Sequence, residues 1–170
     1  MRRSFQLAGL ACSAVVMETP GAACLTNAPL AIDDVRYAGV VVVGRIANYR
    51  IVPYHERGRT RQGVHIGDYA RFDIVVEEVL KGRPGTRIAA TWDNSTFPEP
   101  ATMRPGRYLI ALRGAGSGRP PLRGPSATVM PHPDPRTLAV LQAPCAPAII
   151  FEMASPEAQA LRPWLLRRRR

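Results

Sequence analysis

Three histidines and the carboxylates beside them are the first residues to consider for metal chemistry. His55 is followed by Glu56, and His65 and Asp68 come later in the same polar, glycine-containing stretch. His132 lies between two prolines and has no obvious partner in the sequence. A zinc-protease helix needs a second histidine one helical turn after the first, and this sequence lacks it. A metal site also needs ligands that converge, whereas histidines in a polar loop are usually solvated. The sequence therefore predicts no metal site and no cofactor.

The sequence also carries no clear arrangement for general acid–base or nucleophilic catalysis. Glu77 and Glu78 are adjacent, so on a strand their side chains point to opposite faces. No serine lies in the strand–turn–helix motif that exposes a nucleophile. The glycine-rich segment 114–118 is not followed by the lysine and hydroxyl residue of a phosphate-binding loop. We therefore expect a protein that is not an enzyme.

The N-terminal segment has the order of an export signal. Arg2 and Arg3 precede an apolar stretch over 5–17, and the small residues of segment 21–23 follow. This pattern predicts a signal peptide over 1–23 and a periplasmic or extracellular protein. The paired arginines also resemble a twin-arginine signal, so the export route stays open between that system and the general one. The alternative is an N-terminal helix of a cytosolic protein.

Cleavage after residue 23 would change the cysteine count. Cys12 would leave with the signal peptide, and Cys24 and Cys145 would remain as an even pair in an oxidising compartment. A disulfide between them would close a loop of more than a hundred residues, worth about 4–5 kcal/mol in the chain-entropy model. The alternative is two unrelated thiols.

Basic residues dominate the charge of the chain, which is +10 at pH 7. Of its 23 basic residues only Lys81 is a lysine. Arginines and aromatic rings interleaved on a barrel bind polyanions in other proteins. The alternative is that the rings lie in the core and the arginines are solvated. The candidate polyanion-binding residues are Arg45, Arg50, Arg71, Arg87, Tyr49 and Trp92.

The C-terminal tail is a second candidate for anionic partners. Its last residues are Trp164, two leucines and four arginines, Arg167, Arg168, Arg169 and Arg170. Such a segment could lie at an anionic membrane surface, where each arginine contributes about 1 kcal/mol. The alternative is a frayed, soluble terminus. If the protein is exported, an anionic envelope polymer or lipid head group is a better partner than nucleic acid.

The pattern along the chain predicts a mainly β protein. Strands are expected over 40–49, 69–80, 87–92 and 107–113, with room for a short one over 127–130. Gly44 interrupts the first of these and is expected to mark a bulge or bend.

Helical turns are expected within 28–38, over 137–142, where Asp134 and Pro135 resemble a helix start, and after Ser155. These elements favour a small five-stranded barrel with two or three short helices, and a small sandwich is the alternative. The expected organisation is a signal peptide over 1–23, a barrel over 24–153, and a C-terminal helix with an arginine-rich tail over 154–170.

Several blocks of this order resemble a known family. They are a cysteine at the mature start, a short helix, the valine-rich block 37–46, the block 70–82 ending in Val-Glu-Glu-Val-Leu-Lys-Gly, the block 105–112, and the late Cys145. Together they resemble exported bacterial proteins related to the tissue inhibitor of metalloproteinases and the netrin module. The resemblance implies a five-stranded OB-fold barrel.

The resemblance also implies a mode of protease inhibition. In the animal inhibitors the free α-amine and carbonyl of an N-terminal cysteine chelate the zinc of a metalloprotease, and Cys24 matches that cysteine. Leu25 and Thr26 would contact the protease beside it, although the family has a second cysteine where this chain has Thr26. The sequence therefore predicts an exported, non-enzymatic binding module, inhibitor-like or polyanion-binding, whose partner it does not name.

Overall fold

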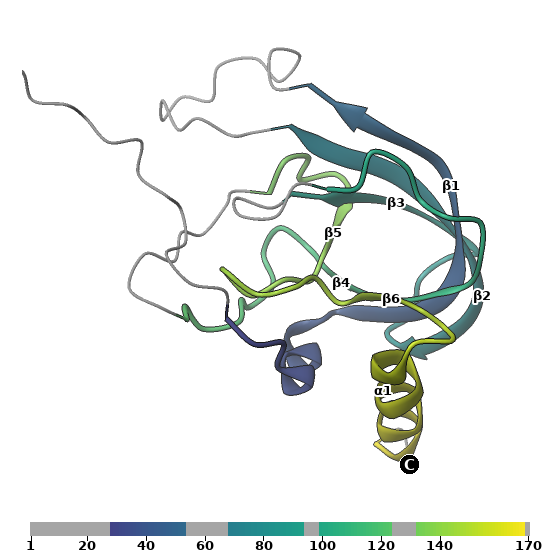
Figure 1. The fold of residues 1–170 in the computed structure, drawn as a ribbon, viewed down its shortest axis with the longest axis vertical. Helices are drawn as coiled ribbons and strands as arrows, with labels where there is room; N and C mark the ends of the chain where they lie inside the picture. The colour runs from purple at the N-terminus through teal and green to yellow at the C-terminus, as the bar shows by residue number, and fades with distance from the viewer. Residues whose placement is uncertain (1–27, 54–67, 94–98, 124–131, 169–170) are drawn as a thin grey trace, which may run out of the picture.

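The chain folds into a closed barrel of five strands with one extra strand and two helices (Figure 1). The computed structural model describes residues 28–53, 68–93, 99–123 and 132–168. The strands are β1 (Val40–Val52), β2 (Tyr69–Lys81), β3 (Arg87–Trp92), β4 (Tyr108–Arg113), β5 (Leu138–Val140) and β6 (Ile150–Glu152). A 3-10 helix, η1 (Ile32–Tyr37), precedes β1, and an α-helix, α1 (Pro156–Arg167), follows β6.

The pairing of the strands closes the sheet. β1, β2 and β3 form an antiparallel meander, β5 pairs with β3 in parallel, and β4 joins β5 to β1. β6 lies beside the first half of β4. This circuit is the expected barrel, consistent with an OB fold, and not the alternative sandwich. A closed sheet leaves few unpaired edges, which suits short strands.

Side chains alternate between the inside and the outside of the barrel. On β2, Ala70, Phe72 and Ile74 point into the interior, and the residues between them point out. β4 is buried on both faces, because its other face is covered by α1 and η1. The core therefore has two layers, one inside the barrel and one between the barrel and the helices.

Gly44 lies where β1 changes register against β2, as expected of a glycine within a strand. A Cβ atom at this position would overlap the carbonyl oxygen of Val75 and press on Ile74. The two strands approach so closely here that only glycine fits, and this allows the long β1 strand to bend around the barrel.

The helix expected after Ser155 is present as α1. The Ser155 side chain accepts a hydrogen bond from the Ala158 N–H at 3.3 Å, and Pro156 occupies the first turn. Ala158, Leu161 and Leu165 share one face of the helix and are buried in the same cluster as Leu109. α1 therefore shares its core with the barrel. It is also too short and too polar to cross a membrane, as is the other helix in the described ranges.

The helix expected over 137–142 was a wrong prediction. Asp134 caps a turn instead, since its side chain accepts a hydrogen bond from the Arg136 N–H and its carbonyl accepts one from the Thr137 N–H. The chain then runs as β5, which pairs with β3 and β4. Local turn chemistry resembled a helix start, but pairing with distant strands decided the outcome.

The short strand expected over 127–130 lies outside the described residues, as do the signal peptide and the polar stretch with His55 and His65.

Candidate functional site

The arginines predicted to bind a polyanion mostly face carboxylates of the protein itself. Arg45 lies 2.8 Å from Glu77, and Arg87 lies 3.1 Å from Asp73. Arg50, the other predicted polyanion-binding arginine on β1, is exposed and lies opposite Arg71 in the β1–β2 ladder. Much of the positive charge on this side of the barrel is therefore neutralised within the fold.

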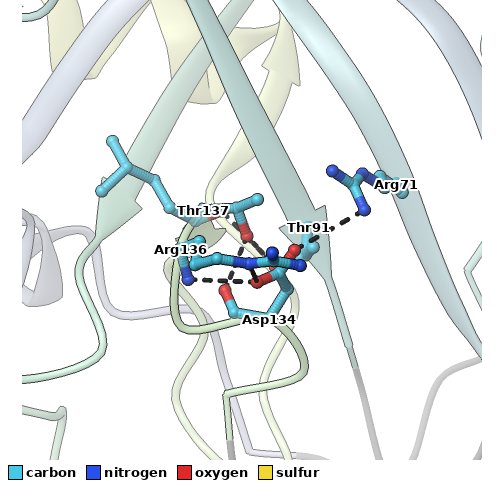
Figure 2. A network of polar contacts seen from close by, with 6 residues as sticks. Arg71, Thr91, Asp134, Arg136 and Thr137 are labelled. Carbon is cyan, nitrogen blue, oxygen red and sulfur yellow. Dashed lines mark hydrogen bonds and ion pairs between the residues drawn. The ribbon is translucent and has the colours of Figure 1, made fainter. Parts of the chain in front are cut away.

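Arg71 belongs to a network on the outer face of the barrel (Figure 2). Its guanidinium lies 3.5 Å from the carboxylate of Asp134, which also accepts hydrogen bonds from Arg136. Burial alone would raise the pKa of Asp134, but the hydrogen bonds from Arg136 and the charges of both arginines outweigh it and lower the pKa. Thr91 and Thr137 lie beneath the loop, with their hydroxyl groups 3.4 Å apart. The network fixes the loop before β5 onto the barrel.

The two predicted stacking rings lie against the barrel core. The Tyr49 ring packs 5.8 Å from that of Phe72, and its hydroxyl donates a hydrogen bond to the carbonyl of Pro100 at 2.6 Å. Burial, with a smaller contribution from Glu99, raises the pKa of Tyr49 to about 12. The Trp92 indole donates to the side chain of Gln142 at 3.3 Å. Both rings thus have partners within the protein and do not form an open stacking platform.

A different region brings apolar and cationic side chains together around a cavity. η1, the end of β2 and α1 meet at one end of the barrel, at the lower edge of Figure 1. The cavity between them has a volume of about 330 Å³. Its apolar lining consists of Val35, Leu80, Trp164 and Leu165. All but Trp164 are buried core residues, so this wall is held in place by the packing of the barrel.

Three cationic side chains line the same cavity. They are Arg36 from η1, Lys81 from the end of β2, and Arg168 at the end of α1. No carboxylate lines the cavity, and none of the three forms an ion pair within the described ranges. Arg168 instead lies over the Trp164 ring at 4.2 Å. Here, unlike on the arginine-bearing face of β1 and β2, the positive charge remains uncompensated.

Lys81 is the most constrained of these cations. Its ammonium group donates to the carbonyl of Arg36 at 3.0 Å and lies 3.5 Å from that of Val35. It therefore satisfies carbonyl groups at the end of η1 and is itself held at the cavity. Burial lowers the pKa of Lys81, because the charged ammonium loses hydration there.

Two carboxylates of the elements around the cavity form ion pairs with other arginines. Asp34 is buried and accepts two hydrogen bonds from Arg123, at 2.6 and 2.7 Å. Glu78 pairs with Arg162 of α1 in the same two-pronged manner, at 2.9 and 3.0 Å. These pairs fix η1 and α1 and occupy the carboxylates of Asp34 and Glu78 away from the cavity cations.

The turn after β2 closes one side of the cavity. Gly82 lines it and has a φ of 81°, in the left-handed region. A Cβ atom there would lie 2.6 Å from the carbonyl oxygen of Gly39. Only glycine therefore allows the chain to turn this close to the start of β1.

A second group of basic side chains is buried away from the cavity. Arg113 is 9% exposed and its Nη1 has no hydrogen bond, and the ring nitrogens of His132 make none of regular geometry. Burial lowers the pKa of His132, and the charge of Arg113 lowers it further, while Asp134 and the nearby backbone raise it. Burial, with the charge of Arg119, also lowers the pKa of Arg113. This arrangement favours a neutral imidazole.

The residues predicted for protease contact, Cys24, Leu25 and Thr26, lie outside the described residues, as do Arg169 and Arg170. Cys145 is buried, and its carbonyl accepts a hydrogen bond from the Ala28 N–H at 2.7 Å. Its pairing with Cys24 stays a prediction. Of the predicted tail residues, Trp164 and Arg168 line the cavity and Arg167 is exposed.

The sequence reasoning missed Arg36 and Lys81 as site residues. The single lysine was visible, but its position opposite α1 depends on the fold. Among the residues with described positions, no three histidine, cysteine or carboxylate side chains are grouped to hold a metal ion.

No protein-family model matches this chain, and the searches of curated proteins and of solved structures found no significant match.

Proposed function

We propose that this protein is an exported, non-enzymatic binding module that binds an anionic component of the cell envelope. The observation that carries the proposal is the cavity between η1, β2 and α1, where Arg36, Lys81 and Arg168 gather without a carboxylate. Uncompensated cations near a partly apolar surface favour a ligand that is both anionic and apolar. Trp164 and the arginine tail begin at the same place, which favours a lipid surface over a dissolved polymer.

Binding to vesicles of defined composition tests the proposal. The mature full chain should sediment with vesicles that contain an anionic phospholipid and stay in solution with purely zwitterionic ones. Binding should weaken as salt is added, because the attraction is electrostatic. Equal binding to both kinds of vesicle, or to neither, would contradict the proposal.

A matched pair of variants locates the surface. The triple variant Arg36→Gln, Lys81→Gln, Arg168→Gln should lose most vesicle binding. A control triple variant that changes Arg45, Arg50 and Arg87 to glutamine removes the same charge from the β1–β3 side and should bind almost normally. If the control loses binding equally, net charge decides the binding and the cavity does not. Removal of residues 169–170 in a further variant separates the contribution of the tail.

A protease-inhibitor-like function is the second candidate, supported by one contact. The hydrogen bond from Ala28 to Cys145 holds the chain four residues beyond Cys24 against Cys145. Four residues span at most about 14 Å, so a disulfide from Cys24 to Cys145 is compatible with this contact. Cys145 is also buried, with 2% of its surface exposed. These facts support a Cys24–Cys145 disulfide at a mature N-terminus.

Intact mass with and without reductant, followed by a protease assay, tests this candidate. A chain that starts at Cys24 and is two hydrogens lighter before reduction would support export and the disulfide. Inhibition of a zinc protease should then require the free α-amine, so one extra residue before Cys24 should abolish it. A full-length, reduced chain would contradict both the export and the inhibitor-like function.

A further inference from the structure

The lining of the cavity at η1 and α1 has an apolar part and a cationic part. Leu80 and Val35, each 1% exposed, and Leu165, 5% exposed, form a rigid apolar wall with Trp164. The cationic groups of Arg36, Lys81 and Arg168 are contributed from three separate elements around this wall. A ligand that satisfies both parts must carry an apolar body and an anionic group.

We propose that the cavity binds one molecule of an anionic amphiphile, with its carboxylate or phosphate group at Lys81 and its apolar body against Trp164 and Leu165. This inference rests on the proposed function and adds the class of the ligand. The shared chemistry covers a fatty acid and the phosphate of a lipid head group.

The position of Lys81 favours an anionic group there over water alone. An ammonium group has three N–H donors. Its contacts at 3.0 and 3.5 Å use at most two of them, on the carbonyls of Arg36 and Val35. One donor therefore remains for a ligand, on a side chain that its hydrogen bonds already orient. A preoriented donor loses less entropy on binding than a free side chain does.

The surrounding charges also favour an anion. Arg36 lies within the same lining and is oriented by its contact with the Tyr37 hydroxyl at 3.1 Å. No acidic residue of η1, β2 or α1 belongs to the lining, and Asp34 and Glu78 are engaged by Arg123 and Arg162. A bound carboxylate or phosphate would therefore meet cations and no opposing carboxylate. It would also offset the desolvation of Lys81, whose pKa burial lowers.

The size of the cavity favours a discrete molecule. A volume of about 330 Å³ lies at the lower end of the range of small-ligand sites, roughly 300–1,000 Å³. A polymer chain would instead need a row of cations along the barrel, where Arg45, Arg71 and Arg87 face carboxylates. Among the described cations without an ion pair, Arg36, Lys81 and Arg168 lie around one cavity.

Soluble short-chain probes test the inference on the mature full chain. Octyl phosphate, octanoate, octanol and inorganic phosphate, each used below its aggregation concentration, are titrated while tryptophan fluorescence is recorded. Octyl phosphate or octanoate should bind saturably. Octanol, which lacks the charged contact, and inorganic phosphate, which lacks the apolar body, should each bind at least about tenfold more weakly. A stronger response to octyl phosphate than to octanoate would indicate a phosphate head group, and the reverse a fatty acid. Equal binding of octanol or of inorganic phosphate would overturn the inference.

Variants connect the response to the cavity. Trp164→Phe should remove the fluorescence change and leave the signal of Trp92. Lys81→Gln should weaken binding by about tenfold. Lys81→Arg keeps the charge and should retain part of the binding affinity. Arg87→Gln, at a position outside the cavity lining, is the matched control. If Lys81→Gln does not fold, Arg36→Gln tests the same lining, and wild-type affinity in both glutamine variants would overturn the inference.

The two proposals fail separately. Binding to anionic vesicles without binding of any soluble amphiphile would overturn the single-ligand inference and leave the proposed function standing. If the protein binds neither anionic vesicles nor any soluble amphiphile, both the proposed function and the single-ligand inference are overturned.

Discussion

The guanidinium group of Arg162 contacts both carboxylate oxygens of Glu78, at 3.0 and 2.9 Å, and thereby joins α1 to β2. The pair lies between two elements that line the cavity. It therefore links the position of Trp164 to the strand that carries Lys81.

Replacement of Arg162 should loosen α1 modestly. The two side chains are 40% and 29% exposed, so Arg162→Gln should lower the free energy of unfolding by about 1 kcal/mol or less, because water screens a half-exposed pair. Urea unfolding measures this change. Arg104→Gln is the control, since the Arg104–Glu152 pair is more exposed and its atoms are 3.8 Å apart. Equal effects of both variants would show that the two-pronged geometry contributes nothing.

Replacement of Arg123 should be much more costly. Asp34 is 3% exposed, and Arg123 is its partner through two hydrogen bonds. Arg123→Met would leave a buried carboxylate without its counterion, which typically costs about 3–5 kcal/mol. The double variant Asp34→Asn, Arg123→Met should recover much of that loss. A double-mutant cycle from denaturant midpoints measures the coupling, and additive effects would contradict it.

Gly82→Ala should destabilise the turn after β2. The substitution places a Cβ atom 2.6 Å from the Gly39 carbonyl oxygen at a φ of 81°. A left-handed conformation alone costs an alanine about 1–2 kcal/mol, and the overlap adds to this. Gly85→Ala is the matched control, because its Cβ atom would meet nothing closer than 3.8 Å. Thermal unfolding of both variants should show a loss for Gly82→Ala alone.

Acidification should destabilise the fold through His132. Its pKa is lowered in the folded protein, first by burial and then by the charge of Arg113. The stabilisation from a neutral imidazole is therefore complete above the unfolded pKa of about 6.5 and is lost as pH falls through the folded value. His132→Gln should flatten the stability profile between neutral pH and about pH 5. An unchanged profile would contradict this assignment.

Much of the fold could be predicted from local pattern. The alternation of Ala70, Arg71, Phe72 and Asp73 predicted β2 correctly, because a strand with one buried face repeats every two residues. Gly44 predicted the bend of β1, because a glycine within a strand often marks a bulge or a bend. The start of α1 at Ser155 followed from capping chemistry alone.

What could not be predicted depends on contacts between distant segments. β5 has only three residues, and its pairing with β3 and β4 decided its conformation. The cavity brings Arg36, Lys81 and Arg168 together from three parts of the chain, and no spacing in the sequence reveals this. Conversely, Arg45 and Arg87 appeared as a free basic surface because the sequence does not show which carboxylates face them.

The position of the single lysine has a practical consequence. Reagents that acylate primary amines react with the unprotonated form, and in this chain they have two targets, the α-amino group and Lys81. Because burial lowers the pKa of Lys81, its amine is available at lower pH than that of an ordinary lysine. A fluorophore or cross-linker attached there would lie inside the cavity at η1 and α1, and would report directly on whatever enters it.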